Sequence, residues 1–247
     1  MIQRFREAWS TTEAAGSTPR RLGLLGEWAV QAADERLTDR YFRLHGLDTA
    51  GYGARRGEGD SFPYSPTRWR TLPRLFPRGS LGPEDVLVDY GCGKGRVPIW
   101  VASHFTVRRV IGVDMDRDLR TAAEANWERW SGPRRCESVE FVCEDATNFE
   151  VPDDVTIVYM YNPFRGEVFE RVVDKLRASV VRRARSLRIV YSFPLMHDAL
   201  VAAGFSVVRQ QPNRSWVSTE SSDSGGERVP PWLPPYSATI YRLTGAD

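Results

Sequence analysis

The sequence predicts an α/β fold in which a doubly wound sheet of mainly parallel strands is flanked by helices. Strand-like and helix-like segments alternate between residues 84 and 209, and this alternation is typical of parallel strands joined by right-handed crossovers. A glycine-rich stretch, Asp89–Gly95, stands between the first predicted strand and the first predicted helix. Ligands of such sheets bind at the carboxyl ends of the strands, so this stretch marks a candidate site.

Each predicted element depends on a local pattern of apolar residues. Short apolar runs rich in β-branched residues predict six strands, at Val86–Asp89, Arg109–Val113, Val139–Val142, Val155–Tyr161, Leu187–Phe193 and Phe205–Arg209. Helical spacing predicts the elements between them, at Val97–His104, Asp118–Trp130, a long helix that includes Val168–Leu176, and Met196–Ala203. Residues 236–243 are expected to return antiparallel beside the fifth or sixth strand.

The segments outside this alternation are expected to cover the site. Residues 1–80 form a predicted N-terminal helical extension that serves as a lid, with an amphipathic helix at 22–45. Four glycines between residues 51 and 60 predict a mobile loop. Thr67 is expected to cap a short helix that runs through Trp69 and Leu72. The main domain is expected at 81–247, with an irregular, proline-containing loop at 210–235 on the substrate side.

Composition narrows the class of protein. The chain has 247 residues, 41% hydrophobic and 27% charged, with a net charge of +2, so no nucleic acid or membrane partner is indicated. Its three cysteines lack a CxxC pair, which argues against a disulfide framework and a metal site. No apolar stretch approaches the roughly 18 residues that span a bilayer, and the N-terminus does not resemble a signal peptide. A cytoplasmic location is expected.

The spacing of the glycine-rich stretch distinguishes between ligands. Dinucleotide-binding loops read G-x-G-x-x-G and direct a helix N-terminus at pyrophosphate, whereas this chain reads Gly91-x-Gly93-x-Gly95 with Asp89 two residues before the first glycine. A carboxylate there would repel pyrophosphate. It suits a cation such as the amino group or sulfonium of S-adenosylmethionine (SAM). The alternative is a tight strand-to-helix turn without a ligand, in which Cys92 is a small filler.

Acidic residues also end the second and third predicted strands. Asp114 follows Gly91 by twenty-three residues and could accept both hydroxyls of a ribose, with Met115 against an adenine face. Asp145 could accept an adenine amino group while the Ala146 N–H meets a ring nitrogen. The alternatives are that Asp114 caps the following helix and that Asp145 belongs to an ordinary surface turn.

These residues together resemble the class I SAM-dependent methyltransferases. The resemblance rests on the D-x-G-x-G-x-G run at 89–95, on Asp114, on Glu144-Asp145-Ala146 and on Tyr161-Asn162-Pro163-Phe164. It implies a Rossmann-like seven-stranded sheet of order 3-2-1-4-5-7-6 with strand 7 antiparallel, SAM as cofactor and S-adenosylhomocysteine as product. The motifs VDYGCGKGR and YNPF are similar to those of a bacterial subgroup whose substrates are mostly unassigned. The implied cofactor-binding residues are Tyr64, Thr67, Asp89, Gly91, Cys92, Gly93, Gly95, Asp114, Met115, Asp145, Ala146 and Tyr161.

The Tyr161–Phe164 stretch stands where the methyl acceptor is expected. It is similar to the Asn-Pro-Pro-Phe/Tyr motif of amino-methylating enzymes, in which an Asn side-chain oxygen and a backbone carbonyl accept from the substrate NH₂. One proline is missing here, and a strand simply stopped by Pro163 is the alternative. Tyr161 and Asn162 are the catalytic candidates, together with His197 as a general base. His197 could instead be a surface residue at a helix start.

The sequence therefore predicts a methyltransferase that acts on a small metabolite, as in specialised biosynthesis. A nitrogen of that metabolite is favoured over an oxygen as the methyl acceptor. One alternative is a protein-lysine methyltransferase, which would use a run of basic residues as a docking surface rather than as a solvated helix face. The run comprises Lys175, Arg177, Arg182, Arg183, Arg185 and Arg188. Others are a non-catalytic SAM-binding module and a nicotinamide-dependent oxidoreductase, which the glycine spacing disfavours.

Overall fold

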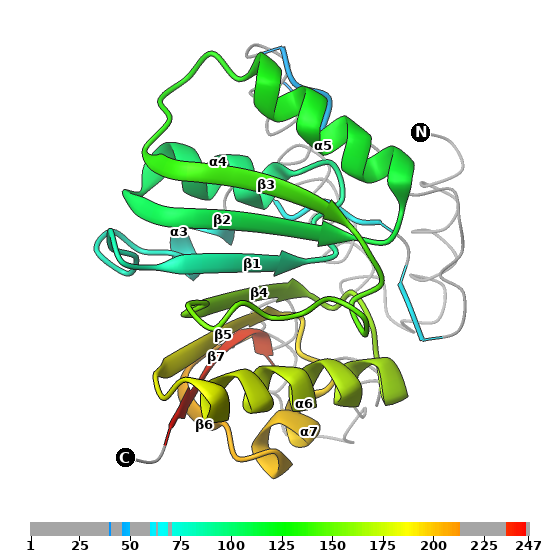
Figure 1. The fold of residues 1–247 in the computed structure, drawn as a ribbon, viewed down its shortest axis with the longest axis vertical. Coiled ribbons are helices and arrows are strands. Elements are labelled where there is room, and N and C mark those ends of the chain that lie inside the picture. Colours follow the sequence, from blue (N-terminus) through cyan, green and yellow to red (C-terminus); the bar gives the residue numbers. More distant parts are fainter. Residues whose placement is uncertain are drawn as a thin grey trace, which may run out of the picture.

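A computed structural model describes residues 40, 46–49, 60–62, 64–68, 71–212 and 236–245. Its centre is one seven-stranded sheet with strand order β3-β2-β1-β4-β5-β7-β6 (Figure 1). The strands are β1 (Val86–Tyr90), β2 (Val107–Asp114), β3 (Cys136–Cys143), β4 (Ile157–Tyr161), β5 (Ser186–Ser192), β6 (Ser206–Pro212) and β7 (Tyr236–Thr244). The predicted α/β class and strand order are confirmed.

All neighbouring strands from β3 to β5 are parallel, and β7 is antiparallel to both β5 and β6. The chain turns back at the end of the sheet and inserts its last strand between its fifth and sixth. In the middle, Val88 pairs with Ile111 on one side and Val158 on the other. β1 is buried along its whole length, because helices cover both faces of a parallel sheet.

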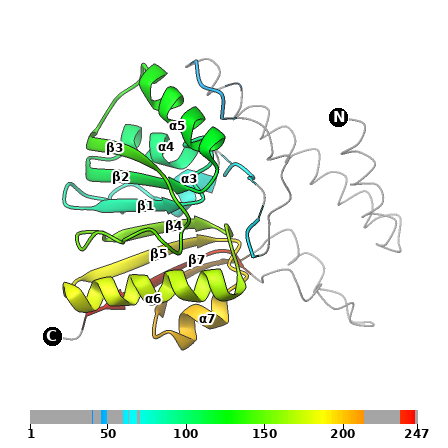
Figure 2. The same ribbon diagram turned by 45° about the vertical axis from the view of Figure 1, so that its right-hand side comes forward.

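Helices lie on both faces of the sheet (Figure 2), and the two largest hydrophobic clusters pack between these helices and the strands. The helices are α3 (Leu72–Leu75), α4 (Arg96–His104), α5 (Arg117–Arg129), α6 (Gly166–Arg182) and α7 (His197–Ala202). Val88 and Tyr90 of β1 pack in the core with α6 and α7, whereas Leu87 packs in the core with α3 and α4. Alternate residues of a strand face opposite sides, so Asp89 belongs to the α4 side.

The N-terminal prediction needs one correction. Thr67 does not cap a helix, because α3 begins only at Leu72 and its N-cap residue is Thr71. Thr67 is instead buried, and its hydroxyl hydrogen-bonds the Tyr159 hydroxyl over 2.8 Å. Most of the helix predicted at 22–45, of the loop predicted at 51–60 and of the loop predicted at 210–235 lies outside the described residues. Among the helices that are described, none combines the length and apolar character of a membrane span.

Candidate functional site

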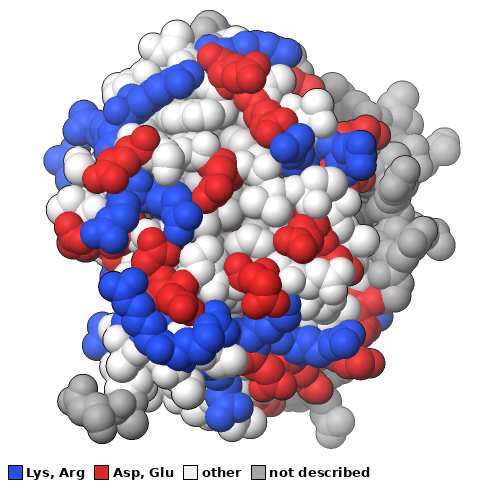
Figure 3. Space-filling view, viewed as in Figure 1, with Lys and Arg blue, Asp and Glu red and all other residues white. Residues whose placement is uncertain are grey.

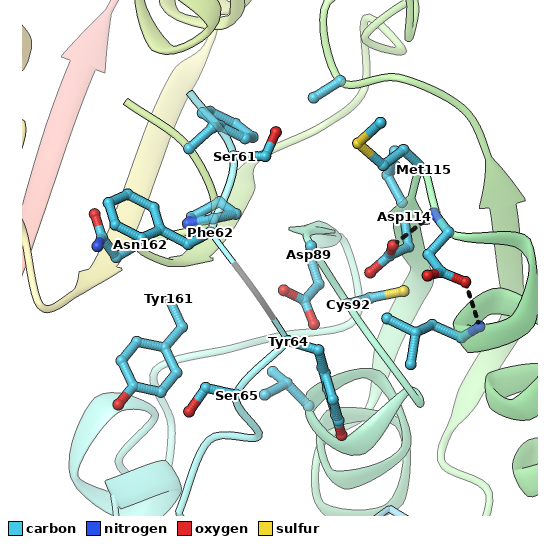
Figure 4. A pocket seen from close by; sticks show the side chains of 18 of the residues that line it. Ser61, Phe62, Tyr64, Ser65, Asp89, Cys92, Asp114, Met115, Tyr161 and Asn162 are labelled. Atoms are coloured by element: carbon cyan, nitrogen blue, oxygen red, sulfur yellow. Dashed lines mark hydrogen bonds between the residues drawn. The ribbon is translucent and has the colours of Figure 1, made fainter. Parts of the chain in front are cut away.

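A cavity of about 420 Å³ lies at the carboxyl ends of β1 to β4 (Figure 4). Its floor is formed by residues that end these strands, and residues 61–62 and 64–67 from the N-terminal region line it as well. The volume is within the usual range for a small-molecule site. The location agrees with the expectation that ligands of an open α/β sheet bind at the strand carboxyl ends.

The glycine-rich loop forms the turn between β1 and α4. The Gly91 N–H donates to the Val113 carbonyl over 2.8 Å, which ties the loop to the end of β2. Gly91 has φ +71°, and a Cβ there would lie 2.8 Å from Pro163 Cβ. Gly93 has φ +54°, and a Cβ there would lie 2.0 Å from the Tyr64 ring. Both positions therefore require glycine for conformation and for close packing.

Asp89 carries a buried carboxylate that lines the cavity. The residue is only 2% exposed, and no described residue donates a hydrogen bond to its carboxylate. Burial, followed by the charge of Asp114, raises the pKa of the Asp89 carboxyl well above its usual value. An unpaired buried carboxylate is costly unless a ligand compensates it. Asp89 therefore favours a cationic or hydrogen-bond-donating group in the cavity.

Asp114 at the end of β2 holds the loops around it. Its Oδ2 accepts from the Gly93 N–H over 2.8 Å, and its Oδ1 accepts from the Asp116 N–H over 2.9 Å. Burial raises the pKa of Asp114, and the two N–H bonds partly offset this. The residue does not cap the next helix, since Asp116 accepts from the N–H groups of Asp118 and Leu119 and caps α5. Each Asp114 oxygen keeps a second lone pair for a ligand.

The end of β3 adds a third carboxylate. Asp145 Oδ1 accepts from the backbone N–H and the hydroxyl of Thr147, over 2.7 and 2.6 Å. Its other oxygen has no hydrogen-bond partner among the described residues. Asp145 and Ala146 line the cavity, as does Met115, whose side chain is 59% exposed. These three residues form the side of the cavity where an adenine ring is expected.

Two short N-terminal segments are attached to the sheet by a buried arginine. Arg96, in the first turn of α4, donates to the Thr49 hydroxyl and carbonyl over 3.1 and 2.8 Å and to the Thr67 carbonyl over 3.0 Å. The Tyr64 hydroxyl donates to the same Thr49 carbonyl over 3.0 Å. A cation at a helix N-terminus opposes the helix dipole. That position is the one sequence signal that Arg96 has a tertiary partner, and Arg96 is absent from the residues predicted for the site.

The far end of the cavity is formed by the segment after β4. Asn162 lines the cavity, and its Oδ1 accepts from the Tyr191 hydroxyl over 3.1 Å. The Pro163 carbonyl accepts from the Phe62 N–H over 2.9 Å, so the strand end and the N-terminal segment are hydrogen-bonded to each other. Tyr161 also lines the cavity. In Figure 4, Tyr161 and Asn162 lie on the side opposite Asp114 and Met115.

Three residues predicted for the site do not line the cavity. Gly93 is covered by the Tyr64 ring, and Gly95 faces Ala123 and Phe141, so both contribute to the packing of the loop rather than to the cavity wall. His197 begins α7, and its Nδ1 lies 2.6 Å from the Tyr241 hydroxyl. We therefore assign His197 no part in the proposed chemistry. The other predicted residues, from Tyr64 to Asn162, all line the cavity, and their contact with a ligand stays a prediction.

Cys92 lines the cavity within the glycine-rich loop. Burial, and then the charges of Asp89 and Asp114, raise the pKa of the Cys92 thiol well above its usual value. The thiolate is the nucleophilic form of cysteine, so Cys92 is poorly suited to nucleophilic catalysis. Within the described ranges, no group of three or more His, Cys, Asp or Glu side chains is arranged to hold a metal ion.

The basic run on and after α6 is largely paired within the molecule. Lys175 bonds Glu150 and Arg182 bonds Asp153, each over 2.8 Å. Arg185 donates to backbone carbonyls, and Arg188 lies 3.4 Å from Asp85. Figure 3 accordingly shows acidic side chains interleaved with basic ones on this face. These contacts do not favour the interpretation of the run as a docking surface.

Comparisons with known proteins agree with this geometry. Residues 87–184 match the family model described as "Methyltransferase domain". A protein-lysine N-methyltransferase of Saccharolobus islandicus is 33% identical over 67 residues, which are 27% of this chain and 42% of that protein. The chain thus matches less than half the length of this curated relative.

The chain is also similar to solved structures. A putative RNA methyltransferase from Pyrococcus horikoshii aligns with a TM-score of 0.50 and 14% identity, over 85% of this chain and 96% of that one. An RNA methyltransferase from Salinibacter ruber in complex with S-adenosylhomocysteine aligns with a TM-score of 0.45 and 19% identity, over 73% and 94% of the two chains. The stretch that matches the methyltransferase model, residues 87–184, contains the glycine-rich loop, Asp114 and Asn162, and the strand order and the cavity at the strand ends are consistent with that match.

Proposed function

We propose that this protein transfers the methyl group of SAM to an amine nitrogen of a small molecule. Asp89 would bind the SAM amino group, Asp114 the ribose hydroxyls, and Asp145 with Ala146 the adenine edge. The buried, unpaired Asp89 carboxylate supports this fit, because a cationic group is the partner that such a carboxylate lacks. SAM would supply an activated methyl group, and the protein would hold the acceptor in line with it.

The charges of the cavity favour an amine acceptor over an anionic one. Six carboxylates line the cavity, with Arg96 as the one basic lining residue among those described, and Arg96 is engaged by Thr49 and Thr67. Most of the carboxylates come from the ends of β1 to β3 and the turns that follow, and Asp118 comes from the first turn of α5. An anionic acceptor would be repelled by them, whereas a neutral amine would not.

The end of the cavity near Tyr161 and Asn162, where we expect the methyl acceptor, favours a nitrogen over an oxygen acceptor because the described residues there provide no side chain suited to remove a proton. Among the described residues from 60–68 and 159–168 that line the cavity, none is a histidine, lysine or carboxylate. A protonated hydroxyl acceptor needs a base positioned to remove its proton. A neutral amine has a free lone pair and can attack without one. Tyr161 and Tyr64 would contribute aromatic walls to this end.

Activity and cofactor binding can be tested on the full chain. Calorimetry should show binding of SAM and S-adenosylhomocysteine but not of NAD. Transfer from SAM carrying a labelled methyl group should then be compared over panels of small amines, phenols and carboxylic acids. We expect label in the amine panel. Binding of NAD without SAM, or label only in phenols or acids, would contradict the proposal.

A lysine side chain of a protein is the second candidate acceptor. It is favoured by the similarity to the Saccharolobus protein-lysine N-methyltransferase, and a lysine ammonium on its slim stem could enter a cavity of about 420 Å³. Lysine-containing peptides belong in the same assay. Label in peptides but in no free amine would replace the small molecule by a protein as substrate.

A further inference from the structure

Two hydrogen-bond acceptors at the far end of the cavity each accept a hydrogen bond from within the chain. In the motif that Tyr161–Phe164 resembles, an Asn oxygen and a backbone carbonyl accept from the substrate NH₂. Here Asn162 Oδ1 accepts from the Tyr191 hydroxyl over 3.1 Å, and the Pro163 carbonyl accepts from the Phe62 N–H over 2.9 Å. Each of these two oxygens therefore has one lone pair left rather than two, and its orientation is fixed by a partner within the chain.

The hydrogen bond of Tyr191 determines which way the Asn162 amide points. The Tyr191 hydroxyl has a single proton to donate, and its oxygen lies 3.1 Å from Asn162 Oδ1. Tyr191 is fully buried, so this proton needs an acceptor, which Asn162 Oδ1 provides. Turning the amide over would leave the proton without a partner, at a cost of about 1–3 kcal/mol. The amide oxygen therefore stays on the Tyr191 side.

The Asn162 amide nitrogen is then the group available to a ligand. No described residue accepts a hydrogen bond from Nδ2, yet this atom is not among the buried polar atoms that lack a partner. It is consequently reachable by solvent, and the residue lines the cavity. An accessible NH₂ group at the cavity wall offers two N–H donors and no acceptor.

We infer that Asn162, held by Tyr191, is a hydrogen-bond donor to the methyl acceptor, which carries a neutral accepting atom such as a carbonyl or ether oxygen beside its amine. A carboxylate in that place would be disfavoured by the acidic cavity. This inference rests on the proposed function, since it assumes that the acceptor occupies this end of the cavity. It makes Asn162 a specificity-determining residue and Tyr191 its positioning residue.

NMR of the full, ¹⁵N-labelled chain with S-adenosylhomocysteine tests the inference. The probes are N,N-dimethylacetamide, a neutral acceptor without N–H groups, and tetramethylammonium, a cation without an accepting atom. The Asn162 NH₂ signals, identified by their loss in Asn162→Asp, should move downfield with dimethylacetamide only. Asn162→Asp retains an acceptor for Tyr191 and tolerates the φ of +45°, but it should weaken dimethylacetamide binding roughly 5- to 10-fold through loss of the donor.

Tyr191→Phe provides the matched control because it removes only the hydroxyl. We expect its Asn162 NH₂ signals to change position and to lose their response to dimethylacetamide, since the amide is no longer oriented. The inference would be overturned if the Asn162 NH₂ signals did not shift on addition of dimethylacetamide, or if they shifted by the same amount in Tyr191→Phe. S-adenosylhomocysteine binding is measured on the same samples. Its failure would contradict the proposed function, while the Asn162 signals could still be read in the free protein.

Discussion

Replacing Asp114 by alanine tests the carboxylate on which the glycine-rich loop and the proposed ribose contact both depend. The change removes the acceptors of two backbone N–H groups, those of Gly93 at 2.8 Å and of Asp116 at 2.9 Å. The Gly93 bond is buried, whereas water can reach the Asp116 bond more easily. The variant therefore reports on the stability of the free protein and on its affinity for SAM in one experiment.

The magnitudes follow from these contacts. The buried Gly93 N–H would lose its acceptor at a cost of about 1–3 kcal/mol, and the more accessible Asp116 N–H would lose its acceptor at a lower cost. Burial of the Asp114 carboxylate is itself unfavourable, so its removal offsets part of this loss of stability. We expect a net destabilisation of about 2–3 kcal/mol, or a Tm lower by roughly 4–12 °C. Loss of a charge-assisted hydrogen bond to ribose should raise the Kd for SAM roughly 10- to 150-fold.

Asp85→Ala is the matched control for this variant. Asp85 lies at the opposite end of β1, where it accepts from the Gly82 N–H over 2.8 Å and from the Thr156 hydroxyl over 2.7 Å. It should lower Tm by a comparable amount and leave the affinity for SAM unchanged, as measured by thermal unfolding and calorimetry. If Asp114→Ala bound SAM as tightly as the native chain, the ribose assignment would be refuted. An unchanged Tm would refute the role of Asp114 in holding the loop.

Three further predictions concern the same end of the sheet. Because burial raises the pKa of Asp89 in the folded protein, the free energy of unfolding should fall as pH rises from about 4. Thermal unfolding at several pH values should show a weaker dependence on pH in Asp89→Asn. The same variant should bind SAM at least tenfold more weakly. Gly93→Ala should lower Tm, since its Cβ would meet the Tyr64 ring at 2.0 Å, and a smaller loss is expected in a Tyr64→Ala background. Arg96→Met should abolish the bonds to Thr49 and increase proteolysis of the N-terminal region; an unchanged digestion pattern would contradict that role.

The doubly wound sheet and the cofactor end of the cavity could be predicted from sequence because their signals are local. Strands such as Val86–Tyr90 are short apolar runs, and Asp89 and Asp114 each end or nearly end one strand. In a parallel sheet, the ends of adjacent strands meet at one edge. Residues far apart along the chain were thereby placed in one site without knowledge of any contact between them.

The acceptor end could not be predicted in this way, because it depends on partners distant in sequence. Tyr191 determines which face Asn162 shows to the cavity, and Tyr241, rather than a substrate, lies beside His197. Thr67 was predicted as a helix cap but bonds Tyr159, since a buried hydroxyl takes the nearest available partner.

The sequence by itself determined the fold class, the strand order through its family resemblance, and the residues that end each strand at the cavity. Only the tertiary structure decided which of their polar atoms remain available to a ligand. The reason is physical: a side-chain amide has an oxygen on one side and a nitrogen on the other, and the hydrogen bond with the Tyr191 hydroxyl determines which of the two Asn162 turns toward the cavity.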